Sequence, residues 1–130
     1  QSYDDLEKDP GYTLQVKKVL EKMKGSGALN KEYTLLDVAC GTGTYATIFA
    51  PYLKRVTGLD ISAGMLKRFK EKIMEKGIEN CELIHQDWQD YLPETPFDIV
   101  FSSMTPLLSY YKNIDKMVAL ARHFLVLVGW

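Results

Sequence analysis

The stretch from Leu35 to Ala46, LLDVACGTGTYA, decides the fold of this chain. An apolar run closes on an acidic residue, Asp37, and a short turn with two glycines, Gly41 and Gly43, leads into a helix-forming sequence. This order predicts a β-strand, a tight turn and the start of a helix. Glycine in such a turn lets the backbone come close to a ligand.

Two kinds of ligand fit this turn. Gly41, Gly43 and Ala46 satisfy the G-x-G-x-x-A form of the dinucleotide fingerprint, in which the backbone approaches a pyrophosphate. Asp37 favours a cationic ligand instead, because a carboxylate at the strand end repels pyrophosphate and attracts an ammonium or sulfonium group. Two unit charges about 4 Å apart interact by roughly 4 kcal/mol at an effective dielectric constant near 20. The remaining alternative is that Asp37 only caps a turn or helix start.

Composition narrows the class of protein. The chain has 130 residues, 46% hydrophobic and 25% charged, which suits a single globular domain over residues 1–130. The net charge of −1 gives no electrostatic reason to expect nucleic acid or a membrane as a partner. The two cysteines and two histidines form neither a metal-ligand pattern nor a disulfide framework, and no apolar segment has membrane-spanning length. We therefore expect a cytoplasmic protein without a metal site.

Apolar periodicity predicts alternating strands and helices. Strands are expected at 34–39, 55–60, 81–86, 97–102 and 124–129, and helices at 12–24, 44–50 and 63–76. A further helix is marked by Ile114, Met117, Val118 and Ala121. The basic run 67–72 is expected to form a solvated helix face, because acidic residues flank it at helical spacing. Strands that alternate with helices predict a parallel sheet covered on both faces.

Acidic residues follow the predicted strands at the edge where open parallel sheets bind ligands. Asp60 lies close to the roughly 20-residue spacing from the glycine turn at which an acid can hold both ribose hydroxyls. A dinucleotide and a nucleoside both require such an acid. Asp87 discriminates between them, because its carboxylate can accept the exocyclic amine of adenine. Trp88 offers a ring face for stacking on a ligand or, equally well, for the hydrophobic core.

The segment after the fourth predicted strand gives only weak evidence for a substrate-binding surface and none for a catalytic residue. Pro106 forces an extended conformation on Thr105 and so shapes a rim where a substrate would approach. Ser102 and Ser103 have no His or Lys base positioned to activate them, so the sequence predicts no catalytic residue. Cys40 is expected to be a small buried filler of the core.

Four segments, in this order and spacing, resemble the motifs of class I S-adenosylmethionine (SAM)-dependent methyltransferases. They are LDVACGTG at 36–43, GLDISAGML at 58–66, HQDW at 85–88 and FDIVF at 97–101. The resemblance implies an α/β fold, a Rossmann-like three-layer sandwich whose mostly parallel sheet has about five strands in the order 3-2-1-4-5. It also implies SAM as cofactor, S-adenosylhomocysteine (SAH) as product and a small-molecule or unidentified methyl acceptor.

The resemblance also implies roles for individual residues. It places Asp37, Gly41 and Gly43 around the methionine part, Asp60 on the ribose and Asp87 on the adenine amine. Ile61 and Met65 would lie on the faces of adenine. Apart from the resemblance, Tyr3-Asp4 could fold back as a lid over the methionine end of the cofactor. The full set of candidate cofactor-binding residues is Tyr3, Asp37, Ala39, Cys40, Gly41, Thr42, Gly43, Asp60, Ile61, Met65, Gln86, Asp87, Trp88 and Ser102.

The chain departs from the family pattern at two places. Ala39 stands where the family usually has its first glycine. The family's sixth and seventh strands are missing, which would leave Phe124–Val128 as an exposed apolar edge. We therefore expect the N-terminal part of a longer chain, or a homo-oligomer or partner chain that covers this edge by strand pairing. Two rival functions stay open, namely a nicotinamide-dependent oxidoreductase and a non-catalytic SAM-binding module.

Overall fold

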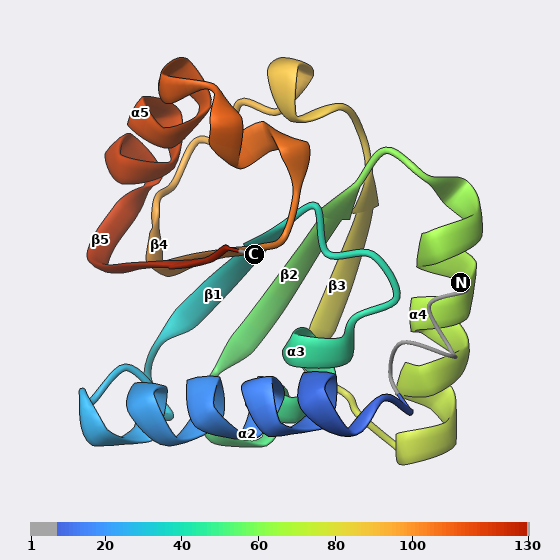
Figure 1. Ribbon diagram of the computed structural model, residues 1–130. Helices are drawn as coiled ribbons and strands as arrows, with labels where there is room; N and C mark the ends of the chain where they lie inside the picture. Colours follow the sequence, from blue (N-terminus) through green and yellow to red (C-terminus); the bar gives the residue numbers. More distant parts are fainter. Residues whose placement is uncertain (1–7, 130) are drawn as a thin grey trace.

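The computed structural model describes residues 8–129, in which five parallel strands form one sheet (Figure 1). The strands are β1 (Thr34–Val38), β2 (Arg55–Asp60), β3 (Cys81–His85), β4 (Phe97–Ser103) and β5 (Ala121–Val128). Their order across the sheet is β3-β2-β1-β4-β5, and each neighbouring pair is parallel. This order confirms the fold that the resemblance implies.

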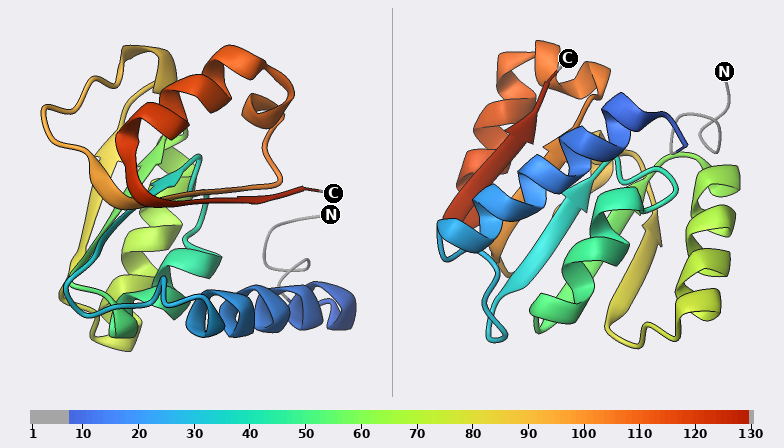
Figure 2. Two further views of the ribbon diagram at one scale, coloured as in Figure 1. Left: turned by 90° about the vertical axis from the view of Figure 1, so that its left-hand side faces the viewer. Right: turned by 60° about the horizontal axis from the view of Figure 1, so that its bottom comes forward.

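Helices cover both faces of the sheet, as the alternation of strands and helices predicts. The helices are α2 (Pro10–Gly25), α3 (Thr44–Phe49), α4 (Ala63–Lys76) and α5 (Tyr111–Leu120), with the 3₁₀ turns η1 (Ala50–Tyr52), η2 (Trp88–Asp90) and η3 (Pro106–Ser109). The side chains of α2, α3 and α4 share one core cluster, and those of α5, η2 and η3 share the other. The left view of Figure 2 shows α5 above the sheet and α2 below it. The fold is therefore a three-layer sandwich.

One aromatic ring determines how α4 packs on the sheet. Phe69 is fully buried, and its ring occupies the space in which Cβ atoms of residues 43 and 58 would lie. A Cβ at Gly43 would come within 2.6 Å of the ring, and one at Gly58 within 2.8 Å. Gly43 also has φ +79°, a left-handed conformation that residues with a side chain rarely adopt. The glycine turn therefore serves the packing of α4, in addition to its expected role in ligand binding.

Two expectations for the helices are wrong, because tertiary pairing outweighs the local pattern. The periodicity places Ala121 on the last helix, but α5 ends at Leu120 and Ala121 pairs with Phe97 in the sheet. Val118, expected on the buried face, is 55% exposed. The ends of α4 follow local sequence rules, since Ser62 is its N-cap and Gly77 ends it in the left-handed conformation.

The basic run at 67–72 is a solvated face only in part. Arg68 pairs with Glu71 and Glu75 at 3.4 and 3.5 Å, as a solvated helix face would. Lys72 is different, because only 6% of it is exposed and its Nζ donates a hydrogen bond to Thr42 Oγ1 at 3.1 Å. The expectation is wrong for Lys72, since α4 turns this position inward against the glycine turn.

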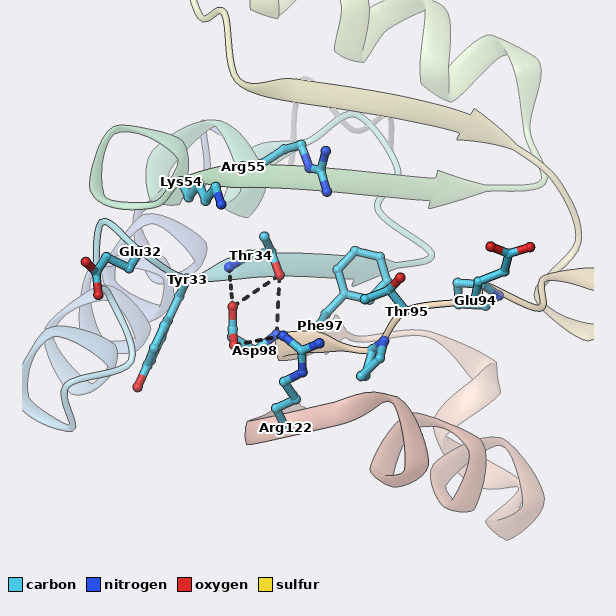
Figure 3. Close-up of a pocket in the computed structure, with 12 residues that line it drawn as sticks. Glu32, Tyr33, Thr34, Lys54, Arg55, Glu94, Thr95, Phe97, Asp98 and Arg122 are labelled. Carbon is cyan, nitrogen blue, oxygen red and sulfur yellow. Dashed lines mark hydrogen bonds and ion pairs between the residues drawn. The ribbon is translucent and has the colours of Figure 1, made fainter.

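Asp98 ties the amino ends of three strands together (Figure 3). One carboxylate oxygen, Oδ2, accepts hydrogen bonds from the Thr34 N–H at 2.8 Å and the Thr34 hydroxyl at 3.3 Å. The other oxygen lies 3.8 Å from Arg122 Nη1 and 3.7 Å from His123 Nε2. Thr34, Asp98 and Arg122 line a cavity of about 510 Å³ at the end of the sheet opposite the acidic strand ends. The role of Asp98 there is to hold the register of β1, β4 and β5.

Candidate functional site

A cavity of about 310 Å³ lies at the carboxyl ends of the strands, between η2 and η3. Open parallel sheets bind their ligands at this edge. The structure brings six of the candidate residues together here, namely Ala39, Asp60, Ile61, Gln86, Asp87 and Trp88. The remaining wall consists of Leu59, Thr105, Pro106 and Leu107. The cavity therefore combines two carboxylates with apolar surfaces.

Asp60, the last residue of β2, is oriented by the backbone. Its Oδ2 accepts a hydrogen bond from the Gly41 N–H at 2.8 Å, and its Oδ1 accepts one from the Ser62 N–H at 2.8 Å. These bonds tie the glycine turn after β1 to the start of α4. A carboxylate oxygen can accept more than one hydrogen bond, so Asp60 keeps acceptor capacity for ligand hydroxyls. These two backbone hydrogen bonds therefore fix the orientation of its carboxylate.

Asp87 and Trp88 form the η2 side of the cavity. The Oδ1 atom of Asp87 caps η2 by accepting from the Gln89 N–H at 2.9 Å, which leaves acceptor capacity on Oδ2. Trp88 is only 4% exposed and belongs to the core cluster of α5, yet it also lines the cavity. Its Nε1 is buried and has no hydrogen-bond partner among the described residues. Trp88 is thus a core aromatic that presents part of its surface to the site.

Asp37 lies beneath the glycine turn and outside the wall of this cavity. It is 3% exposed, and burial raises the pKa of its carboxyl well above the ordinary range, with the negative charge of Asp60 raising it further. Within residues 8–129 no salt bridge or hydrogen bond to this carboxylate is formed. A buried carboxylate without a partner is costly, so a cation that reached Asp37 would be held strongly.

Two further polar groups near Asp37 are buried without partners of good geometry. They are the hydroxyls of Tyr45, at the start of α3, and Ser103, at the end of β4. Burial raises the pKa of Tyr45 to about 12, and the nearby Ser103 lowers it only in part. Buried polar atoms without a hydrogen bond are rare in native proteins. Together with Asp37, these hydroxyls fit a polar ligand group better than they fit an apolar core.

The candidate residues Cys40, Thr42 and Met65 lie in the glycine turn or at the start of α4 and do not line the cavity. Cys40 is buried, and burial raises the pKa of its thiol, as expected for a small core residue. Thr42 is 4% exposed and accepts the hydrogen bond of Lys72, while Met65 lies in the first turn of α4. Tyr3 lies outside the described residues.

Ser102 does not present its side chain to the cavity. It is fully buried, and its hydroxyl donates to the Val38 carbonyl at 2.7 Å, which joins β4 to the end of β1. Because β4 continues through Ser103, the Ser102 side chain is held within the sheet, and cofactor binding by this residue stays a prediction.

Sequence reasoning missed part of the cavity wall. Leu59 and Leu107 line it and were not predicted, whereas Thr105 and Pro106 were expected to shape a rim, from the restriction that proline places on the preceding residue. The Thr-Pro pair was the usable signal for Thr105, which caps η3 by accepting from the Leu107 N–H at 3.3 Å. Ala39 adopts φ +59°, so it takes the left-handed conformation that the family's glycine would take more easily.

A family profile described as "Methyltransferase domain" matches residues 35–128. This chain belongs to that methyltransferase family. The match spans β1 to the end of β5 and confirms the resemblance to class I SAM-dependent methyltransferases. Among the described helices of this methyltransferase domain, none is both long and apolar enough to cross a bilayer.

Named relatives agree with this family. The methyltransferase domain is 37% identical over 103 residues to a demethylmenaquinone methyltransferase of Listeria welshimeri, covering 76% of this chain and 43% of the relative. It is 32% identical over 105 residues to malonyl-[acyl-carrier protein] O-methyltransferase 1 of Ilyobacter polytropus, covering 77% of this chain and 35% of the relative. The chain thus spans less than half the length of these relatives.

Solved structures show the same fold at low sequence identity. Magnesium protoporphyrin IX methyltransferase from Synechocystis PCC 6803, crystallised with SAM, matches with a TM-score of 0.78 at 23% identity, over 98% of this chain and 64% of that one. A SAM-dependent methyltransferase from Aquifex aeolicus matches with a TM-score of 0.76 at 22% identity, over 100% of this chain and 73% of that one.

Proposed function

We propose that this chain is the cofactor-binding core of a cytoplasmic SAM-dependent methyltransferase that acts on a small molecule. The observation that carries the proposal is the buried carboxylate of Asp37 beneath the glycine turn. A pyrophosphate at this turn would raise the pKa of Asp37 further and gain no positive partner, whereas the ammonium and sulfonium groups of SAM would stabilise the charged form of this carboxylate. Membership of the methyltransferase family supports the same cofactor.

The residues at the carboxyl edge fit the parts of SAM. Asp37, Gly41 and Gly43 would hold the methionine part, where the unpartnered hydroxyls of Tyr45 and Ser103 add polar groups. At the other end, carboxylates with spare acceptor capacity would receive hydrogen-bond donors. Asp60 would accept the ribose hydroxyls and Asp87 the adenine amine, between the apolar surfaces of Ile61, Trp88 and Pro106.

The chemistry belongs mainly to the cofactor. When bound, SAM supplies an activated methyl group that a nucleophile on the acceptor takes by in-line displacement, leaving SAH. The residues of this chain bind and orient the donor, which lowers the entropic part of the barrier. No side chain of the described residues is assigned as a general base.

Two measurements test this function. Calorimetric titration of the protein with SAH and, separately, with NADH should give binding with SAH alone. Binding of NADH without SAH would replace the proposal with a nicotinamide-dependent oxidoreductase. Radiolabelled methyl transfer from SAM to a metabolite pool then separates an enzyme from a non-catalytic SAM-binding module, because the module would bind SAH and transfer no label.

Asp37→Asn is expected to weaken SAM binding about 10- to 100-fold at neutral pH, because it removes the carboxylate whose charged form would pair with the ligand cation. The same change should stabilise the ligand-free protein. The folded-state pKa of Asp37 is raised, so the folded protein binds this proton more tightly than the unfolded chain. Wild-type stability is therefore expected to fall as pH rises from the unfolded pKa to the folded pKa, and the loss is complete above the folded pKa.

The pH dependence of the melting temperature and the SAM affinity check this prediction together. Below the unfolded pKa of Asp37 the wild type and Asp37→Asn should melt alike, and the variant should gain relative stability as pH rises. Asp98→Asn is the matched control, since it changes a buried carboxylate at the other end of the sheet and should leave SAM affinity unchanged. Unaltered SAM affinity in Asp37→Asn would remove the electrostatic argument for the cofactor.

We also propose that strand β5 pairs with a second chain, in a homo-oligomer or with a different partner. Among the described strands β5 pairs with β4 alone, and Leu127 on it is 40% exposed. An apolar edge strand of this kind is a template for further pairing. Light scattering should show association at micromolar concentration, and Leu127→Lys should reduce it. A wild-type protein that stays monomeric with rapidly exchanging β5 amides would contradict the proposal.

A further inference from the structure

Asn113, a buried residue of α5, forms hydrogen bonds to both η2 and η3, the two rims of the cavity at the carboxyl ends of the strands. Asn113 is 6% exposed, and its Oδ1 accepts a hydrogen bond from Gln89 Nε2 of η2 at 2.9 Å. Its Nδ2 donates to the Leu107 carbonyl of η3 at 3.1 Å. Residues of both η2 and η3 line the cavity and Asn113 does not, so Asn113 connects two parts of the cavity wall from outside it.

Lys116, one turn further along α5, contacts η2 through its ammonium group. Lys116 Nζ donates to the Trp88 carbonyl and lies 4.1 Å from the centre of the Trp88 ring. Desolvation lowers the pKa of Lys116, and the negative charges of Asp90 and Asp87 oppose that shift. The ammonium group therefore interacts with the backbone, the ring and the acids of the same short turn.

Both rims need this support. Each is a short 3₁₀ turn of three or four residues, and such turns have few hydrogen bonds of their own. A turn that moved freely would have to be ordered when a ligand binds, and this ordering would lower the affinity. Sites that discriminate between similar ligands depend on supporting side chains that hold the contacting groups in place.

We propose that Asn113 and Lys116 form an α5 latch that positions η2 and η3, and so sets both the affinity for the nucleoside and the preference for adenine. The proposal rests on the proposed function, because it takes the cavity as the adenosine site. The latch acts through Asp87, whose carboxylate would accept the adenine amine, and through the Trp88 surface beside it. Asn113 and Lys116 are therefore positioning residues.

The test compares two ligands that differ only at the base. S-inosylhomocysteine carries an oxygen in place of the 6-amino group of SAH, so the ratio of their dissociation constants measures recognition of the amine. Lys116→Met keeps the apolar stem but removes the ammonium group, and Asn113→Asp loses the donor to Leu107. Lys112→Met is the matched control, because Lys112 lies exposed on the same helix and contacts neither rim within residues 8–129.

Wild-type protein is expected to prefer SAH by about tenfold or more, the usual value of one charge-assisted hydrogen bond. Lys116→Met and Asn113→Asp should weaken SAH binding about tenfold and reduce the preference at least about threefold, whereas Lys112→Met should change neither. Loss of folded protein alone would lower both affinities equally and leave their ratio unchanged. An unchanged ratio in both latch variants would overturn the latch, and a wild type that binds neither ligand would overturn the proposed function instead.

A spectroscopic readout accompanies the affinity measurement. In a Trp130→Phe background the fluorescence reports on Trp88, because the chain has two tryptophans. Removing the ammonium group from the ring in Lys116→Met should shift or brighten this emission, and SAH should then change it less than in the parent. Lys112→Met should retain the parent spectrum, and a Lys116→Met spectrum identical to the parent would contradict the contact.

Discussion

Asp60→Ala is expected to reduce the affinity for SAH by at least about 100-fold, the largest functional loss that we predict for a single side chain. The change removes the proposed acceptor for two ribose hydroxyls, and hydrogen bonds to a charged group contribute about 1.5–3 kcal/mol each. It also removes the carboxylate that receives the Gly41 and Ser62 N–H groups. The glycine turn would lose its tie to α4 and would have to be ordered by the ligand.

Isothermal calorimetry with SAH checks this result, and two further variants make it specific. Asp60→Asn keeps an oxygen acceptor but loses the charge, so its affinity should fall between those of the wild type and Asp60→Ala. Asp115→Ala, an exposed change on α5, should bind SAH as the wild type does. An Asp60→Ala protein within about threefold of the wild-type affinity would show that the ribose is not held at this strand end.

Gly43→Ala is expected to give the largest loss of stability, about 3 kcal/mol or more in the free energy of unfolding. The new methyl group would lie 2.6 Å from the Phe69 ring, and overpacking of a core costs about 1–3 kcal/mol. The left-handed backbone at φ +79° adds about 1–2 kcal/mol for a residue with a side chain. Urea denaturation followed by circular dichroism measures the sum of these effects.

A second glycine provides the control that separates the two effects. Gly77 also has a left-handed conformation, at φ +63°, but a Cβ there meets nothing within 4 Å. Gly77→Ala should therefore show only the backbone part, about 1–2 kcal/mol. Adding Phe69→Leu to Gly43→Ala should be less destabilising than the two single effects combined, because the shorter side chain makes room. Equal costs for Gly43→Ala and Gly77→Ala would show that the clash is relieved by a small shift.

The predictions for Asp60→Ala and Gly43→Ala both concern the turn between β1 and α3. The turn between β1 and α3 touches Phe69 of α4 on one side and presents a backbone N–H to Asp60 on the other. Substitutions that reshape this turn are therefore expected to affect stability and cofactor affinity together.

Local sequence determined most of the architecture and the acidic edge of the site. Apolar runs with period two and period 3.6 depend only on near neighbours, so the strands and helices were predicted to within a few residues. Because the carboxyl ends of parallel strands meet at one edge, the positions of Asp60 and Asp87 at strand ends already placed both acids there. The sheet order came from the family resemblance, and the structure confirms it.

Tertiary structure alone decided which side chains face the cavity and which support it. From the sequence, Lys72 is predicted to be a charge on a solvated helix face and Ser102 a hydroxyl at a strand end. In the folded protein both side chains are buried. Asn113 and Lys116 gain their roles from contacts with Gln89 and Trp88, residues more than twenty positions away in the chain. Periodicity carries no information about such contacts, because they depend on how α5 packs across the sheet. The hydrophobic periodicity of a helix or strand determines which of its faces is buried. Which residues that face contacts is determined only when the helices pack on the sheet.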